Sequence, residues 1–277
     1  RTWTLEGPLY QRTDAERYNS DSLKPTLLND GRLMALGYNF HRTDPDQTLT
    51  NPDPDIDGCR DGENLVLFSE DDGHTWSHPR IIPRRHPELI EQSGPAIQLR
   101  SGVLLGAGSM YPRWDGSNPS GCVGALLRSE DNGETWRYVA TIVRADVQET
   151  VSYGPADIAR LPDGTLSAFI EVNDRGTGPG FSPRIARSTS MDGGTTWTAP
   201  VNTLVGPRPS TVVLENGALL CGTSADDGVH VAISYDGGIR WSSMLYVRDV
   251  IHYRSGTRGG IWLTEPTGDS IFGVCHW

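Results

Sequence analysis

The densest group of side chains capable of acid–base or metal chemistry lies between His41 and Glu63. Asp53, Asp55 and Asp57 alternate there, a spacing that can present carboxylates to Ca²⁺, although prolines interrupt the usual pattern and no Glu closes it. The prolines predict an irregular polar loop rather than a strand. A solvated acidic loop without chemistry is the other interpretation. The aspartates of this loop are Asp44, Asp46, Asp53, Asp55, Asp57 and Asp61.

The elements that must position this loop are repeats. The motif Ser-x-Asp-x-Gly-x-Thr-Trp begins at Ser69, Ser129 and Ser190, and a fourth copy from Ser234 has Arg240 in place of Thr. An apolar run precedes three of the four serines, so the motif predicts a tight hairpin turn. The Asp is expected to bond its own backbone and to do no chemistry. The tryptophans of the motif are predicted to be structural: Trp76, Trp136, Trp197 and Trp241.

A second repeat places a glycine turn between two apolar runs. Its copies contain Asp30-Gly31, Ser101-Gly102, Asp163-Gly164, Asn216-Gly217 and a weaker Gly268-Asp269. Hairpins are therefore expected over residues 22 to 40, 93 to 110, 154 to 171, 208 to 223 and 253 to 276. Each unit reads strand, glycine turn, strand, variable loop, strand, Asp turn, strand. This order predicts an all-β propeller of four-stranded antiparallel blades, with five or six blades in one domain of residues 1–277.

Blade geometry predicts which end of each blade carries function. Both kinds of turn must lie at one end, so the remaining loops share the other end, and binding residues are usually carried on such loops. Polar and aromatic side chains expected there on the strand that opens each hairpin are Lys24, Glu91, Gln92, Ser152, Tyr153, Arg208, Tyr253 and Arg254. Those expected after the second strand are Asn39, His41, Arg42, Tyr111, Arg113, Glu171, Asn173, Asp174, Arg175, Asp226, Asp227 and His276.

Composition excludes several classes of function. The net charge of -11 disfavours nucleic acid as a partner, because such binding needs a basic surface. The chain has no run of 18 apolar residues, so membrane insertion is not expected. A chain that begins at Arg1 without Met favours a secreted or periplasmic protein whose leader has been removed. We predict no bound metal or cofactor.

The four cysteines, Cys59, Cys122, Cys221 and Cys275, lack the spacing of a zinc site. Cys59 and Cys122 could form a disulfide, and the other two are expected to be small buried hydrophobic residues.

The four Ser-x-Asp-x-Gly-x-Thr-Trp motifs resemble the Asp boxes of the sialidase superfamily, and the resemblance covers nearly the whole chain. It implies a propeller with an exo-glycosidase site at the centre of one face. It also implies an acid/base Asp on the loop from His41 to Glu63, where Asp57 has the matching spacing and Asp61 is the alternative. Asp boxes also occur in propellers that only bind carbohydrate or protein.

The resemblance further implies a tyrosine nucleophile at the start of a late inner strand, a position that Tyr253 matches. A phenol is protonated at neutral pH, so it needs a carboxylate neighbour to take its proton. Glu171 is the first candidate for that carboxylate, with Glu91 and Asp157 behind it. The alternative for Tyr253 is simple packing at the mouth of the channel, and for Glu171 a structural ion pair with Arg254 or Arg258.

The chain departs from the family at the residues that bind the substrate carboxylate. Sialidases use three arginines, the first in Arg-Ile-Pro, where this chain has Leu23-Lys24-Pro25. Lys does not reproduce the two-pronged geometry of a guanidinium. We therefore predict a different set of substrate-binding residues: Arg42, Arg208, Arg254, Arg258, Lys24, Tyr111 and Tyr153.

These observations predict a glycoside hydrolase that acts on a terminal sugar of a glycan, not necessarily sialic acid. Two alternatives stay open: a propeller that binds carbohydrate without cleaving it, and one that uses its charged rim to bind a protein.

Overall fold

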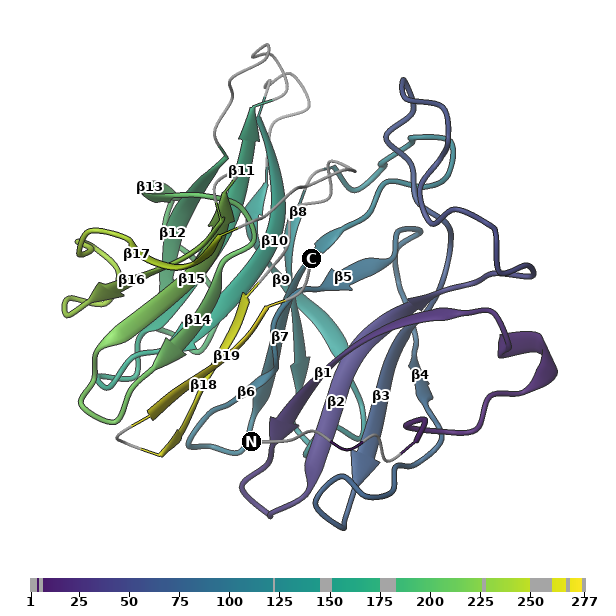
Figure 1. Cartoon of the computed structure of the whole chain (residues 1–277), viewed down its shortest axis with the longest axis horizontal. Helices are drawn as coiled ribbons and strands as arrows, with labels where there is room; N and C mark the ends of the chain where they lie inside the picture. The colour runs from purple at the N-terminus through teal and green to yellow at the C-terminus, as the bar shows by residue number, and fades with distance from the viewer. Residues whose placement is uncertain are drawn as a thin grey trace. The chain divides into compact units, whose positions relative to one another are not determined.

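The computed structural model describes residues 4, 7–121, 123–144, 151–174, 183–225, 228–249, 261–267 and 270–275. These residues form strands and turns, with one short 3₁₀ turn, η1 (Asp14–Glu16), before the first strand (Figure 1). Antiparallel pairing runs through the sheets. The predictions of an all-β chain and of four-stranded antiparallel units are therefore confirmed.

The first two sheets come from the N-terminal half of the chain. The first has the order β1–β2–β3–β4, and the second has the order β5–β7–β8–β9 with β6 paired to β7. The strands of the first sheet are β1 (Ser20–Leu27), β2 (Leu33–Phe40), β3 (Asn64–Ser69) and β4 (Arg80–Ile82). Those of the second are β5 (Ile90–Gln92), β6 (Ile97–Gln98), β7 (Leu104–Met110), β8 (Val123–Ser129) and β9 (Arg137–Arg144).

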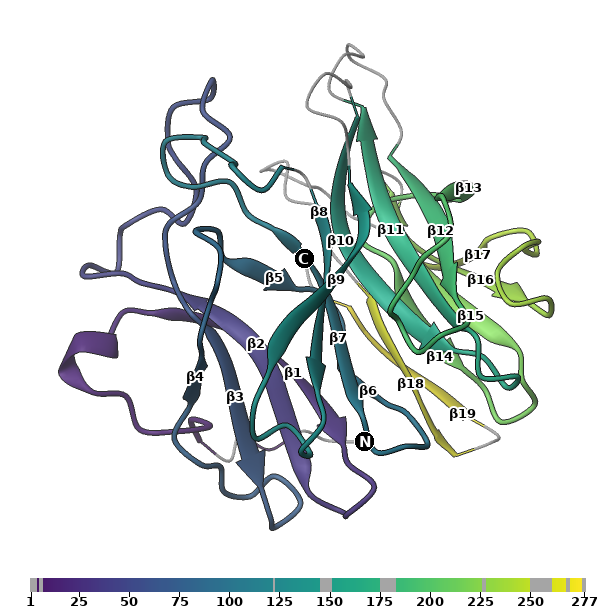
Figure 2. The same cartoon turned by 180° about the vertical axis from the view of Figure 1, so that it is seen from behind.

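The third and fourth sheets repeat the same order, as Figure 2 shows for β10 to β13. The third sheet contains β10 (Val151–Arg160), β11 (Leu166–Asp174), β12 (Arg184–Ser190) and β13 (Val201–Val205). The fourth contains β14 (Ser210–Val213), β15 (Leu219–Ala225), β16 (Gly228–Ser234) and β17 (Leu245–Asp249). The last pairs β18 (Ile261–Thr267) with β19 (Ser270–Cys275). The first four expected hairpins are present, and the fifth is present over its described residues, 261–267 and 270–275.

The Asp motifs form the predicted turns. Ser129 Oγ donates a hydrogen bond to Asp131 Oδ1 at 2.8 Å and accepts one from the Gly133 N–H at 2.8 Å. The carboxylate of Asp131 also accepts the N–H and hydroxyl of Thr135, and Trp136 Nε1 donates to Gly133 O at 2.9 Å. The first and third motifs repeat this network. In the fourth, the tryptophan of the motif bonds a neighbouring strand, with Trp241 Nε1 2.8 Å from Thr203 Oγ1.

The same hydrogen bonds account for the expectation that these carboxylates do no chemistry. The Thr75 hydroxyl and N–H, together with the Ser69 hydroxyl, lower the pKa of Asp71 to about 2. The corresponding hydrogen bonds in the third motif lower the pKa of Asp192 to about 2 as well. A carboxylate with so low a pKa holds no proton to give at neutral pH.

The two ends of the first sheet are different. The β1–β2 and β3–β4 turns lie at one end, and the loop from β2 to β3 lies at the other (Figure 1). That loop contains the aspartates between His41 and Glu63. The topology of this sheet therefore separates its Asp motif from its acidic loop.

The middle strands of the sheets are the most deeply buried. Every residue of β3 and β7 is buried, as is β2 after its first residue. These strands are mostly apolar, as expected for strands that are covered on both faces. In the third and fourth sheets, Phe169, Ile185, Leu219 and Cys221 form one apolar cluster.

The chain divides into two compact units. Unit 1 comprises Arg1–Gly106, Met110–Ser120 and Leu127–Tyr138, and unit 2 comprises Ala107–Ser109, Gly121–Leu126 and Val139–Trp277. The single domain over residues 1–277 stays a prediction. Within the described part of the chain, no helix has the length and apolar character needed to cross a membrane.

Candidate functional site in unit 1 and the polar turn of unit 2

The acidic loop of unit 1 is tied to the segment that follows β7. Asn51 Nδ2 donates to Trp114 O at 2.8 Å, and the Cys59 N–H donates to Pro112 O at 3.1 Å. Asp53 Oδ1 accepts the N–H of Asp55 at 3.0 Å, so this carboxylate caps a turn of its own loop. Among the described residues, no cluster of His, Cys, Asp and Glu has the geometry to hold a metal ion.

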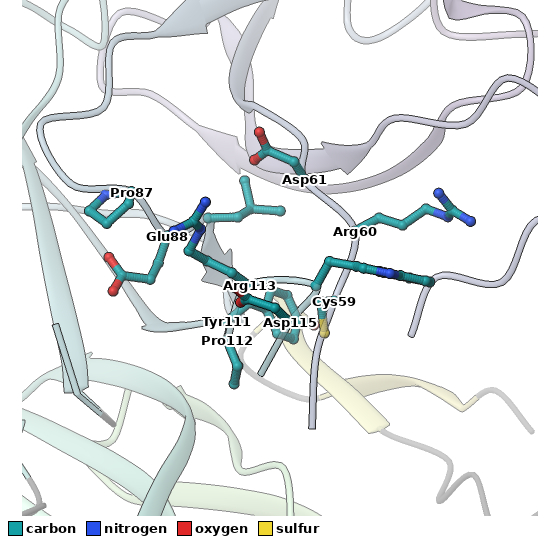
Figure 3. A pocket seen from close by; sticks show the side chains of 11 residues that line it. Cys59, Arg60, Asp61, Pro87, Glu88, Tyr111, Pro112, Arg113 and Asp115 are labelled. Atoms are coloured by element: carbon teal, nitrogen blue, oxygen red, sulfur yellow. The ribbon is translucent and has the colours of Figure 1, made fainter. Parts of the chain in front are cut away.

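A cavity of about 300 Å³ lies where these two segments meet (Figure 3). Two of the predicted site residues, Asp61 and Tyr111, line it together. Its wall also contains the side chains of Cys59, Arg60, Pro87, Glu88, Leu89, Pro112, Arg113, Trp114 and Asp115. The cavity therefore combines carboxylates, guanidinium groups and aromatic rings.

Asp61 is an exposed carboxylate held in an ion pair. Its Oδ1 accepts the Gly62 N–H at 2.9 Å and Arg84 Nη2 at 2.9 Å. Burial raises the pKa of Asp61, but these two hydrogen bonds outweigh it and leave the pKa below its usual value. Gly62 is required beside it, because a Cβ there would lie 1.8 Å from Asn39 O. Asp61 is thus fixed as an ionised carboxylate at neutral pH.

Asp57 differs from Asp61 in its surroundings. Its side chain is exposed, and it does not line the cavity, although Cys59 two residues later does. Burial, followed by the charges of Asp57 and Glu91, raises the pKa of Cys59 to about 12. Cys59 is a free, buried thiol, and Cys122 lies outside the described residues.

Behind the cavity wall, Tyr111 joins a group of polar and aromatic side chains from three strands. Its hydroxyl lies 3.3 Å from that of Tyr38 on β2, and it also forms a hydrogen bond with Glu91 on β5. Burial, the charge of Glu91 and these hydrogen bonds raise the pKa of Tyr111 well above its usual range. The phenol therefore stays protonated and donates a hydrogen bond, which is not the state of a nucleophile.

Lys24 completes this group from β1. Its Nζ donates to Ser22 Oγ at 2.7 Å and lies 6.0 Å from the centre of the Tyr38 ring. Burial lowers the pKa of Lys24, although the charge of Glu91 partly opposes that shift. Lys24, Glu91, Tyr38 and Tyr111 thus form one coupled polar cluster, which we call the Glu91 cluster.

Arg42 was also predicted to bind substrate, and the structure places its guanidinium on the backbone. Nε donates to Tyr18 O at 2.7 Å, and Nη1 donates to Pro45 O at 2.9 Å and Gln47 O at 3.3 Å. These contacts support the start of the acidic loop, so this geometry favours a structural role for Arg42.

Two further predicted residues meet within unit 2. Glu171 on β11 is 9% exposed, and its Oε2 accepts the backbone N–H of Arg208 at 2.7 Å. Tyr153 on β10 is partly buried and pairs with Val172. Tyr253, Arg254 and Arg258 lie outside the described residues, so their predicted roles stay predictions.

Asp157, the other carboxylate considered as a partner for a phenol, is a buried structural acceptor. Its Oδ2 accepts the Thr211 N–H at 2.6 Å and the Thr211 hydroxyl at 2.9 Å, and its Oδ1 accepts the Ile158 N–H at 2.9 Å. Burial outweighs these donors and raises the pKa of Asp157 to about 6.

This shift predicts a pH dependence of stability. Because the folded state binds the Asp157 proton more tightly than the unfolded state, the free energy of unfolding should fall by up to about 3 kcal/mol as pH rises from about 4 to 6. Asp157→Asn removes the titrating group. Urea unfolding of both proteins from pH 4 to 7 measures the effect. The stability of the wild type relative to the variant should decrease across this range, and a constant or increasing difference would contradict the assignment.

Sequence reasoning missed several residues of the cavity. Trp114 is 37% exposed, and the Arg60 guanidinium lies 4.6 Å from the centre of its ring. Glu88 is buried, and its carboxylate accepts the N–H and hydroxyl of Ser120, each at 2.7 Å. The available signal for Trp114 was an aromatic residue in a proline-containing loop after an expected hairpin. No local pattern marks Glu88 or Arg84.

Comparisons with known proteins concern the fold. No protein-family model and no curated protein sequence matches the chain. Among solved structures, a protein of unknown function from Dyadobacter fermentans is 23% identical with a TM-score of 0.62, over 82% of this chain and 64% of that one. The Hadza microbial sialidase Hz136 is 23% identical with a TM-score of 0.63, over 89% of this chain and 48% of that one.

A Penicillium chrysogenum α-L-arabinanase, solved with arabinobiose, is 15% identical with a TM-score of 0.60, over 91% of this chain and 74% of that one. The chain thus spans less than two thirds of the first two structures that it matches. These likenesses show the fold alone, which is a β-propeller.

Proposed function

We propose that this chain is a glycoside hydrolase that acts on a terminal sugar of a glycan, at the cavity of unit 1 and the Glu91 cluster that adjoins it through Tyr111. The observation that carries the proposal is that Asp61 and Tyr111 line one cavity together with Trp114 and Arg113. Its volume of about 300 Å³ is at the small end of ligand sites, which suits one or two sugar rings. Carboxylates and guanidinium groups bond hydroxyls, and an aromatic ring packs on the apolar face of a sugar.

The reaction needs two groups on opposite sides of the glycosidic oxygen. We assign one to Glu91, because Tyr111 donates a hydrogen bond to it and the charge of Lys24 lies near it. The other comes from the acidic loop. The low pKa of Asp61 suits a stabilising charge, and Asp57, on the same loop outside the cavity lining, keeps the acid role predicted from its spacing. The couple predicted from the sequence, Tyr253 with Glu171 in unit 2, is the alternative to this assignment, with Arg208, Arg254 or Arg258 orienting the ligand there.

A binding module without catalysis is the second candidate. The observation in its favour is the ion pair between Asp61 and Arg84, which holds that carboxylate ionised. An ionised carboxylate accepts hydrogen bonds from sugar hydroxyls well, but it has no proton to give to a leaving group.

The deciding experiment incubates the chain with a panel of oligosaccharides and records both released sugar and binding heat. Asp57→Asn and Asp61→Asn are then compared on whichever glycan responds, with Asp46→Asn as an exposed control on the same loop. We expect at least one site variant to lose roughly 10²-fold or more in kcat/KM, because a positioned acid or base contributes that much. Binding without product release would establish the binding module instead. Unchanged kcat/KM in both site variants would remove the loop from the mechanism.

A further inference from the structure

The turn between β13 and β14 holds an arginine in an unfavourable backbone conformation. Arg208 has φ 50°, the left-handed region that costs free energy for any residue except glycine. Its side chain is exposed, whereas its neighbours Pro207 and Pro209 are buried. Glycine would adopt this backbone without strain, so the conformation alone does not explain why arginine stands here.

Three contacts from different strands or loops clamp this turn. The Gly206 N–H donates to Pro183 O at 2.8 Å, and Thr223 Oγ1 donates to Pro207 O at 2.5 Å. The Arg208 N–H donates to Glu171 Oε2 at 2.7 Å. Gly206 has no space for a side chain, because a Cβ would lie 2.2 Å from Thr223 Oγ1.

The contact between Glu171 and Arg208 uses a buried carboxylate to hold a backbone group. A backbone N–H bonded to a carboxylate is among the stronger hydrogen bonds in proteins. In this turn the hydrogen bond to Glu171 offsets the backbone strain at Arg208, the one residue of the turn whose side chain is exposed. Strain that surrounding structure maintains at an exposed polar residue is typical of a ligand-contacting position.

We propose that Glu171 is a positioning residue, which acts through the backbone of Arg208, and that Arg208 contacts hydroxyl oxygens of a glycan bound at this turn of unit 2. The identity of the ligand rests on the proposed function, whereas the clamp does not. In this arrangement the glutamate needs only an oxygen that accepts an N–H. Glutamine supplies such an oxygen, and alanine does not.

The test therefore compares Glu171→Gln with Glu171→Ala. Hydrogen exchange of the Arg208 amide should stay near the wild-type rate in Glu171→Gln and rise about tenfold in Glu171→Ala, since a lost hydrogen bond of this kind is worth roughly that factor. Arg208→Gly should raise the Tm by relieving the strain. An Arg208 amide that exchanges at the same rate in Glu171→Ala and the wild type would overturn the clamp.

Kinetics on the responding glycan test the ligand contact. Glu171→Ala should raise KM about tenfold with kcat nearly unchanged, and Glu171→Gln should leave both near wild type. Arg208→Gly should raise KM as well, and adding Glu171→Ala to it should raise KM no further, because both act through the same guanidinium. Loss of kcat in Glu171→Gln would overturn the proposal and make Glu171 catalytic.

The two sets of measurements separate the two proposals. A wild-type chain that neither binds nor cleaves any glycan overturns the proposed function and the ligand contact with it. Amide exchange and unfolding still decide the clamp in that case.

Discussion

Glu91→Gln is expected to lower kcat/KM on the glycan that the chain cleaves by roughly 10²- to 10⁴-fold, the contribution of a positioned catalytic carboxylate. Glutamine keeps the size of the side chain and can still accept the hydrogen bond from Tyr111, but it removes the charge. The loss should therefore fall on kcat more than on KM. Initial rates at saturating and limiting substrate, with Tm recorded for each protein, measure it.

Two variants control this prediction. Glu70→Gln makes the same chemical change at an exposed residue in the Asp motif of the first sheet, and it should leave the rate unchanged. Tyr111→Phe removes the donor but leaves the carboxylate, so it should cost only about tenfold, the worth of one hydrogen bond to a charged group. If Glu91→Gln retains the wild-type rate while Asp57→Asn or Asp61→Asn does not, Glu91 is not the second catalytic group.

Trp136→Ala is expected to lower the free energy of unfolding by roughly 3 to 5 kcal/mol, as for other large aromatic side chains removed from cores. Trp136 is 7% exposed, and its Nε1–H bonds the carbonyl of Gly133, so the substitution leaves both a cavity and an acceptor without its donor. Urea unfolding followed by fluorescence or circular dichroism measures the change.

Trp76→Ala is the matched control, because this tryptophan makes the same bond, to Gly73 O at 3.0 Å, but is only partly buried. The decrease in the free energy of unfolding should be smaller for Trp76→Ala than for Trp136→Ala. Activity per folded molecule should survive in both variants, since in each of the first two sheets the Asp motif and the loop that lines the cavity lie at opposite ends. A Trp136→Ala protein of normal stability that has lost activity would show that the motif end carries the site.

The repeats could be predicted from the sequence because the interactions that form them are local. In each Asp motif the Ser, Asp and Gly that bond one another lie within five residues, as Ser129 Oγ and the Gly133 N–H illustrate. The glycine turns depend on a single residue at positive φ, such as Gly31 at 89° or Gly164 at 92°. The hairpins, the strand order and the all-β class follow from such local preferences.

The candidate site could be predicted only in part. Sequence position alone placed Asp61 and Tyr111 at the loop end of their strands, and both line the same cavity. The spacing of residues did not reveal that Arg84 pairs with Asp61 at 2.9 Å, or that the guanidinium of Arg42 is taken up by backbone carbonyls. Those contacts decide which carboxylate is ionised and which arginine is engaged.

The sequence by itself determined the four-stranded unit, its turns, and the end of the first sheet that carries the acidic loop. Only the tertiary structure decided that Glu91 faces Tyr111 and Lys24, and that Glu171 holds the backbone of Arg208. The physical reason is the separation along the chain of the residues that interact. A turn is fixed by torsions and hydrogen bonds within a few residues, whereas these contacts join residues many positions apart. Their pKa values depend on burial and on neighbouring charges that exist only once the strands have packed.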